Sequence, residues 1–248
     1  MGDAVMKPTE PETPALSFPE RLLGVFISPG ETFEDVARKP GFWAPLIVIV
    51  VATFAMIETM VWKIGLERLA RMGVEQSSRA SSMSPEQIDQ AVSMGVKVAR
   101  VTTPIFGVLG PPIVLLIIAA VGILIVNVIF GGRAGFKTVF SLVCYADLVS
   151  LLGVIMAVAL MFFGDPEHFN SQNFIPSNVG FFLNQHEVSK PLYALASSAD
   201  IFSIWLLILL GVGLSKGTGG KVKPAPIFLA FAGVWILYVL AKVGFAMI

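Results

Sequence analysis

Charged side chains are scarce in this chain: they make up 14% of its 248 residues, against about 25% in typical soluble domains. Hydrophobic residues make up 55%. Basic and acidic residues are equal in number, so the formal net charge is zero and the net basic character of nucleic-acid-binding proteins is missing. The composition therefore predicts a protein whose main solvent is lipid, and we expect no nucleic-acid partner.

Cysteine and histidine are almost absent. The single cysteine, Cys144, excludes an intrachain disulfide, and its place in an apolar run favours a packing role. The two histidines, His168 and His186, do not show the recurring spacing of metal ligands. The His-Glu-x-x-His and Gly-x-Ser-x-Gly patterns of hydrolases are also missing. We therefore expect no catalytic residues, no metal site, no cofactor and no enzymatic activity.

The N-terminal segment lacks the basic start and apolar centre of a signal peptide. Residues 1–17 instead carry acidic residues and several prolines, which is typical of a disordered tail. We therefore expect the first membrane span to act as its own insertion signal. The remaining residues, 18–248, are expected to form one membrane domain.

Long apolar runs are what the sequence does contain. The hydrocarbon core of a bilayer is about 30 Å thick, and a helix rises about 1.5 Å per residue, so about 20 residues cross it. Five runs exceed this length, and they predict an all-α polytopic membrane protein with a five-helix transmembrane bundle. The runs are Phe42–Trp62, Ile105–Phe130, Thr138–Phe163, Tyr193–Leu214 and Pro226–Ile248.

Short amphipathic patterns lie on either side of the first span. Residues 18–39 predict two short helices, and residues 63–104 predict two more before the second span. Ser84 and Gln87 have the spacing of a capping box, which marks the start of the last of these helices. We expect these helices to lie on the membrane surface or to pack against the spans. Within the second run, Pro111 predicts a bend or a helix start.

The distribution of basic residues predicts the orientation in the membrane. The short loops that follow the second and fourth spans carry several basic residues and no acidic ones. Short loops rich in lysine and arginine stay on the cytoplasmic side. We therefore expect a cytoplasmic N-terminus and an external C-terminus. The basic residues of these loops are Arg133, Lys137, Lys216, Lys221 and Lys223.

Four charged side chains lie inside the predicted spans, where a charge at the centre of a helix costs about 2.5–3.5 kcal/mol. Asp200 and Lys242 lie at matching depths on adjacent spans, so we hypothesise an ion pair between them, with Glu58 close by. Asp147 lies near the midplane, and no basic residue lies at its depth. These four residues are candidate intramembrane polar residues, either as structural pairs or as part of a path for protons or ions.

Several segments resemble a known family when they are read in order. The quoted segments are Arg21–Phe33 (RLLGVFISPGETF), Pro40–Leu46 (PGFWAPL) and Phe130–Lys137 (FGGRAGFK), followed by a third span with Tyr145 near its start. With the five-pass layout, they resemble the Yip domain family, the Ypt/Rab-interacting-protein type of membrane protein. The Asp-Leu-Tyr-Gly-Pro element of its eukaryotic trafficking branch is absent. The chain is therefore similar to the short-headed bacterial branch.

The leading hypothesis is an integral membrane protein of the Yip type that binds or scaffolds, with lipid and other membrane proteins or further copies of itself as partners. The missing trafficking element favours a bacterial inner membrane as the location. For such a scaffold, Phe26, Phe33 and Arg133 are the candidate interaction surface, where substitutions are expected to release partners. The alternative is a small transporter or channel subunit that uses Asp147, Asp200 and Lys242.

Overall fold

The computed structural model describes residues 15–77, 80–164, 173, 175–184 and 187–247, and its regular structure there is helical. This confirms the predicted all-α class. The first 14 residues of the predicted tail and both histidines lie outside the described residues. The helices are α1 (Phe18–Ile27), α2 (Pro29–Arg38), α3 (Trp43–Ile64), α4 (Leu66–Glu75), α5 (Pro85–Ile123), α6 (Phe136–Ala146), α7 (Ser150–Phe163), α8 (Lys190–Ser198), α9 (Ile201–Gly217) and α10 (Pro224–Phe245).

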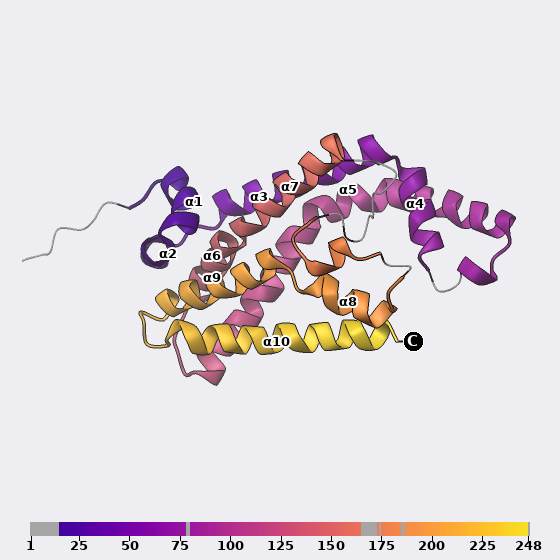
Figure 1. Cartoon of the computed structure of the whole chain (residues 1–248). Helices are drawn as coiled ribbons and strands as arrows, with labels where there is room; N and C mark the ends of the chain where they lie inside the picture. Colours follow the sequence, from indigo (N-terminus) through magenta and orange to yellow (C-terminus); the bar gives the residue numbers. More distant parts are fainter. Residues whose placement is uncertain (1–14, 78–79, 165–172, 174, 185–186, 248) are drawn as a thin grey trace, which may run out of the picture.

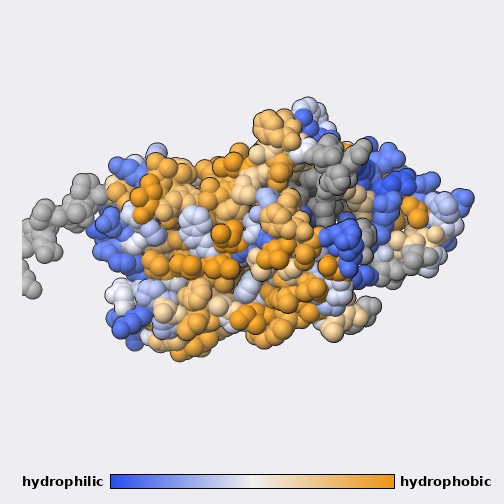
Figure 2. All heavy atoms as spheres, in the orientation of Figure 1, coloured by the Kyte–Doolittle hydropathy of each residue, from blue (hydrophilic) through white to orange (hydrophobic). Residues whose placement is uncertain are grey.

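The helices form an elongated bundle with two different ends (Figure 1). Helices α1 and α2 lie at one end, together with the loops that precede α6 and α10; we call this the α1–α2 end. Helix α4, the start of α5, α8 and the end of α10 lie at the other, which we call the α4 end. Figure 2 shows a hydrophobic middle and mostly hydrophilic ends, as expected for a bundle that crosses a membrane.

Among the described residues, four helical stretches are long and apolar enough to cross a bilayer. They match the first, second, third and fifth predicted spans, and the shorter apolar helix α9 matches most of the fourth. The protein is therefore a multi-pass membrane protein. The four stretches are Trp43–Ile64, Pro85–Ile129, Phe136–Phe163 and Pro224–Phe245.

Helix α5 is much longer than the predicted second span. It begins at Pro85, where Ser84 and Gln87 form the predicted capping box, and it continues through Pro111 without a break. The prediction that the membrane helix starts near Pro111 was wrong. The φ of proline is compatible with a helix and each proline removes only one backbone hydrogen bond, so the helix can continue through it. A helix of 39 residues is about 58 Å long. Its first half therefore extends past the hydrocarbon core at the α4 end.

The predicted fourth span is divided into α8 and α9. Asp200 stands between them as the N-cap of α9, and its Oδ1 accepts a hydrogen bond from the backbone N–H of Ser203 at 2.8 Å. The backbone N–H of Ile201 donates to the carbonyl of Ser177 at 2.9 Å. Aspartate is among the preferred N-cap residues, so the side chain that looked like a buried charge ends one helix and starts the next.

Helices α1 and α2 pack against the bundle, which decides between the two positions that the sequence left open. Phe33 of α2 is fully buried, and its ring faces the backbone of Gly213 in α9. Phe26 of α1 makes an edge-on ring contact with Trp205, with centroids 5.9 Å apart. The missing side chain at Gly213 leaves the space that the ring of Phe33 fills.

Candidate functional site

A buried ion pair joins the two short helices at the α1–α2 end. The guanidinium of Arg21 donates to Asp35 at 2.7 Å, and the two residues are only 8% and 3% exposed. The Arg21 guanidinium also lies 5.8 Å from the ring centroid of Tyr145 in α6. Burial alone would lower the pKa of Arg21, but its contacts with Tyr145 and Asp35 raise it above the ordinary value. The Arg21 guanidinium therefore stays charged, and its contacts with Asp35 and Tyr145 tie α1 and α2 to the bundle.

A second ion pair at this end is exposed. The Lys216 ammonium at the end of α9 donates to Glu34 of α2 at 2.7 Å, and this hydrogen bond lowers the pKa of the Glu34 carboxyl. Arg133 is exposed, whereas Phe26 is half-buried and Phe33 fully buried. The structure therefore removes Phe33 from the candidate interaction surface, because its ring is enclosed by α9.

Asn127 fastens the loop before α6 at the same end. It lies in the π-helical segment Leu124–Ile129, which extends α5. Its side-chain amide donates to the carbonyl of Ala134 at 2.9 Å and accepts from the backbone N–H of Ala134 at 2.8 Å. Asn127 was not among the predicted site residues, although an amide inside an apolar run is a signal of such a role.

A polar pocket of about 290 Å³ opens at the α4 end. It lies where α8, α9 and α10 meet residues 173 and 175–178, and it brings together two of the four predicted intramembrane charges, Asp200 and Lys242. The pocket is lined by Asn173, Ile175, Ser177, Asn178, Ser197, Ser198, Asp200, Ser203, Trp235, Tyr238 and Lys242.

The two charges in this pocket do not form the predicted ion pair. The Lys242 ammonium donates to the hydroxyls of Ser197 at 3.0 Å and Ser198 at 3.2 Å, and within the described residues it has no carboxylate partner. Asp200 accepts from the hydroxyl of Ser177 and from the N–H of Ser203. The prediction failed because Asp200 is used as a helix cap, and nearby hydroxyls solvate Lys242 instead.

The walls of the pocket are fixed by close contacts. Asn178 is buried, and its amide exchanges hydrogen bonds with the amide of Asn173 at 2.7 and 3.0 Å. Asn178 also pairs with Asp200 in an isolated antiparallel bridge. Gly180 lies so close to α8 that an added Cβ would be 2.7 Å from the backbone nitrogen of Ser197. These contacts hold residues 173 and 175–182 against the break between α8 and α9.

Asp147 and Glu58 do not line this pocket. Asp147 lies in the 3-10 segment Asp147–Val149 between α6 and α7, and its carboxylate accepts from the hydroxyl of Ser150 at 3.2 Å. Glu58 is exposed on α3. The structure thus separates the four candidate residues into one pair that shares a cavity and two isolated carboxylates.

An apolar groove of about 570 Å³ also lies at the α4 end, between α4 and the first half of α5. The helices approach closely, since a Cβ on Gly95 would be 3.4 Å from the Ala70 side chain. Arg71 and Asp89 join the two helices at 2.9 Å. The groove is lined by Met60, Val61, Leu66, Leu69, Ala70, Gly73, Val74, Ser77, Met83, Ala91, Gly95, Ala99 and Thr103.

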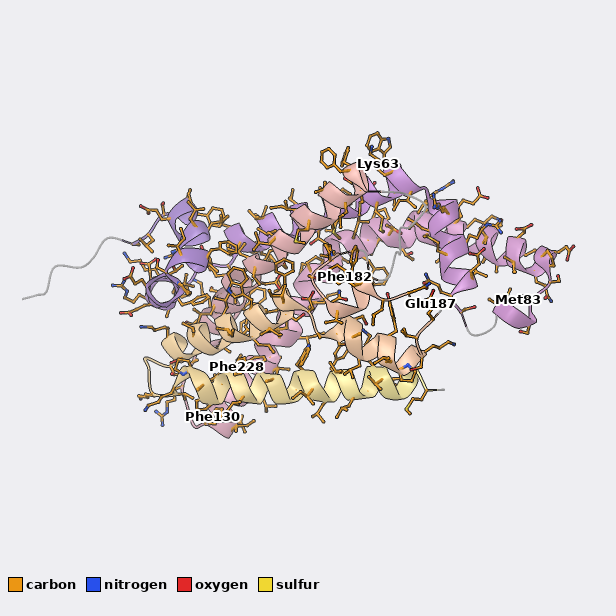
Figure 3. The ribbon with its side chains drawn as sticks, in the orientation of Figure 1. Lys63, Met83, Phe130, Phe182, Glu187 and Phe228 are labelled. Atoms are coloured by element: carbon orange, nitrogen blue, oxygen red, sulfur yellow. The ribbon has the colours of Figure 1, made fainter. Side chains whose placement is uncertain are left out.

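Lys63 lies in the last turn of α3 (Figure 3), and its surroundings are those typical of a residue at the level of the membrane surface. Its ammonium lies 4.2 Å from the ring centroid of Phe162 and 4.7 Å from that of Trp62. Tryptophan and lysine are typical of the membrane–water interface. The groove begins with Met60 and Val61 at this level and reaches Met83, which lies far out at the α4 end in Figure 3.

Comparisons with known proteins agree with this architecture. The Yip1 domain family model matches residues 23–243 of the chain. A relative described as membrane protein YknW, from Bacillus subtilis (strain 168), is 27% identical over 208 residues, which cover 82% of this chain and 80% of that protein. No solved structure matches the chain.

Proposed function

This chain belongs to the Yip1 domain family, and from that premise we propose that it is a scaffold that binds other membrane proteins within a bacterial inner membrane. The partner in this proposal is a transmembrane helix at the point where it leaves the lipid. The binding site is the apolar groove between α4 and α5. The groove is the single observation that carries the proposal.

The lining of the groove favours a helix as its occupant. Small residues on α5, at Ala91, Gly95 and Ala99, recur at a spacing of one helical turn, and Ala70 and Gly73 face them from α4. Small residues let helix backbones approach closely, which is how helices associate in membranes. The larger side chains along the groove are almost all aliphatic or methionine, so a polar ligand would find few partners there.

The position of the groove explains why the partner is a segment that leaves the lipid. The groove starts at the level of Lys63 and follows the part of α5 that extends past the hydrocarbon core. On the same part of α5, Met94, Val98 and Val101 are 63%, 52% and 62% exposed. Apolar side chains that remain exposed beyond the lipid mark an interaction surface. The groove and these side chains together form a continuous apolar face.

The proposal also includes an orientation. The two short loops that carry the basic residues lie at the α1–α2 end (Figure 1), which we therefore assign to the cytoplasm. The α4 end, with the groove, then faces the outside of the cell. A labelling experiment tests this orientation. We expect a tag at the N-terminus to be accessible only after permeabilisation, and a tag at the C-terminus to be accessible without it.

A groove-filling substitution tests the binding function. Gly73 lines the groove and has no atom within 4 Å of an added Cβ, so Gly73→Leu fills the groove without a clash at that carbon. Leucine also has a helix propensity better than that of glycine by up to about 1 kcal/mol. We expect the variant to fold and to lose its partner, measured by quantitative mass spectrometry after cross-linking and mild-detergent purification.

Gly233→Leu is the matched control. Gly233 is exposed on α10, outside the groove, and an added Cβ there also has no neighbour within 4 Å. We expect this variant to keep the partner yield of the wild-type chain. Equal partner yields from Gly73→Leu and Gly233→Leu would contradict the proposal, and so would a wild-type chain that is purified as a monomer without partners.

A further inference from the structure

We propose that the polar pocket at the α4 end binds a zwitterion that carries a phosphate and a primary ammonium, as the headgroup of an ethanolamine phospholipid does. The phosphate contacts Lys242 and the ammonium contacts Asp200. This site is separate from the apolar groove, and the inference does not depend on the scaffold function. It explains why two opposite charges share a cavity of about 290 Å³ without pairing.

The hydrogen bonds around Lys242 favour the binding of an anion. The hydroxyls of Ser197 and Ser198 donate to the carbonyl of Ala194 at 3.1 and 2.7 Å, so their lone pairs are directed to the Lys242 ammonium. An ammonium has three N–H donors, and these two hydroxyls accept from two of them. One donor and the whole positive charge remain for a ligand. Phosphate oxygens are among the acceptors that form the strongest hydrogen bonds with lysine.

Asp200 provides the opposite charge in the same cavity. Its oxygens accept from Ser203 and Ser177, and each carboxylate oxygen has more than one acceptor site. A primary ammonium donates to the remaining sites. A quaternary ammonium has no N–H and cannot do so, so the pocket is expected to select ethanolamine over choline. The side chains of Asn173, Asn178 and Tyr238 complete a polar lining for the ligand.

The pocket is already shaped before a ligand arrives. The amide pair of Asn173 and Asn178, the bridge from Asn178 to Asp200 and the contact of Gly180 with α8 fix one wall. The capping bond of Asp200 fixes the carboxylate. A rigid, preorganised pocket loses little conformational entropy on binding.

The depth of the pocket favours a lipid as the source of the zwitterion. Lys242 lies in the last turn of α10, which is the level of the headgroups in a bilayer. Tyr238 and Trp235 line the pocket one and two turns below, and Tyr238 is 63% exposed. Tyrosine and tryptophan are typical of the membrane interface. Leu237 of α10 and Leu195 of α8, on the helices that line the pocket, are 68% and 52% exposed, as expected for helices that meet acyl chains.

The test is lipid retention by the full-length chain in native mass spectrometry, after titration with phosphatidylethanolamine, phosphatidylcholine or phosphatidylglycerol. We expect wild-type chain to retain phosphatidylethanolamine about tenfold better than phosphatidylcholine, the change expected for one charge-assisted hydrogen bond. Lys242→Gln is expected to lose phosphatidylethanolamine and phosphatidylglycerol alike. Asp200→Asn keeps a capping side chain for α9 and is expected to lose only the preference for ethanolamine.

Lys63→Gln is the matched control, because Lys63 is an interfacial lysine outside the pocket. Equal retention of all three lipids by the wild-type chain overturns the proposal. A loss in Lys63→Gln as large as that in Lys242→Gln also overturns it. Soluble phosphoethanolamine is titrated in a parallel calorimetric experiment. Binding of the soluble compound without lipid retention overturns the lipid as the source and leaves a site for a free zwitterion.

Discussion

The two ends of the bundle use charge in opposite ways. At the α1–α2 end, Arg21 and Asp35 are buried and paired at 2.7 Å. At the α4 end, Asp200 and Lys242 line one pocket but are not paired with each other. A buried pair satisfies both partners and leaves nothing for a ligand, whereas two unpaired charges in a cavity remain able to bind one. The difference supports the proposal that the first end holds the bundle together and the second end binds.

Packing shows the same contrast. At the α1–α2 end, the ring of Phe33 fills the space beside Gly213, and α6 is buried from Val139 to Ala146. At the α4 end, α4 has no buried residue, and the apolar groove beside it stays open. A well-packed end contributes stability, and an open end costs stability unless a ligand or partner covers it.

The largest effect on stability is expected from a substitution that breaks the buried ion pair at the α1–α2 end. Asp35→Ala leaves the Arg21 guanidinium buried without a carboxylate, which typically costs about 3–5 kcal/mol. We expect this loss in the free energy of unfolding, measured by denaturant titration in mild detergent. Glu34→Ala on the same helix removes an exposed pair and is expected to cost at most about 1 kcal/mol. Similar losses in the two variants would show that the buried pair has no special role.

An intermediate effect is expected from the wall of the polar pocket. Gly180→Ala places a Cβ 2.7 Å from the backbone nitrogen of Ser197, and overpacking of this kind typically costs about 1–3 kcal/mol. We expect a lower free energy of unfolding together with weaker retention of phosphatidylethanolamine. Gly233→Ala, which meets no atom within 4 Å, is the control. If Gly180→Ala behaves like this control, the contact does not fix the wall.

The smallest expected effect is the pH dependence of the stability that the exposed ion pair contributes at the α1–α2 end. The hydrogen bond from Lys216 lowers the pKa of Glu34 in the folded chain. The contribution of this ion pair to stability is therefore fully present above the pKa of about 4.3 that Glu34 has in the unfolded chain. It is lost as the pH falls through the lower pKa that Glu34 has in the folded chain. The difference in unfolding free energy between wild type and Glu34→Gln should shrink below about pH 4. A difference that grows on acidification would contradict the assigned pair.

The sequence predicted the features that depend on length and hydropathy. The spans of α3 and α10, the capping box at Ser84 and the all-α class could be predicted because each is encoded in neighbouring residues. The helix break at Asp200 could not be predicted, because its residue type suggests a helix cap while its depth in an apolar run suggests a buried charge. A charge within an apolar run predicts a buried ion as readily as the start of a helix.

The sites depend on contacts between distant segments, and the sequence predicted them only in part. Their matching depths predicted that Asp200 and Lys242 lie close together, and the two residues do line one cavity. The hydroxyls that solvate Lys242 come from a separate helix and were not predicted. The pair of Arg21 and Asp35 was missed because it joins two helices whose packing is not encoded in either helix alone. The groove between α4 and α5 was missed for the same reason, although both helices were predicted.

The most direct measurement compares the two ends in the same membrane. A photo-cross-linking amino acid is placed at Val98, which is 52% exposed on the part of α5 beside the groove, or at Ile27, which is 80% exposed at the α1–α2 end. If the α4 end binds and the α1–α2 end holds the bundle together, irradiation in native membranes gives a discrete protein adduct from Val98 and none from Ile27. An adduct from Ile27 without one from Val98 would contradict this account.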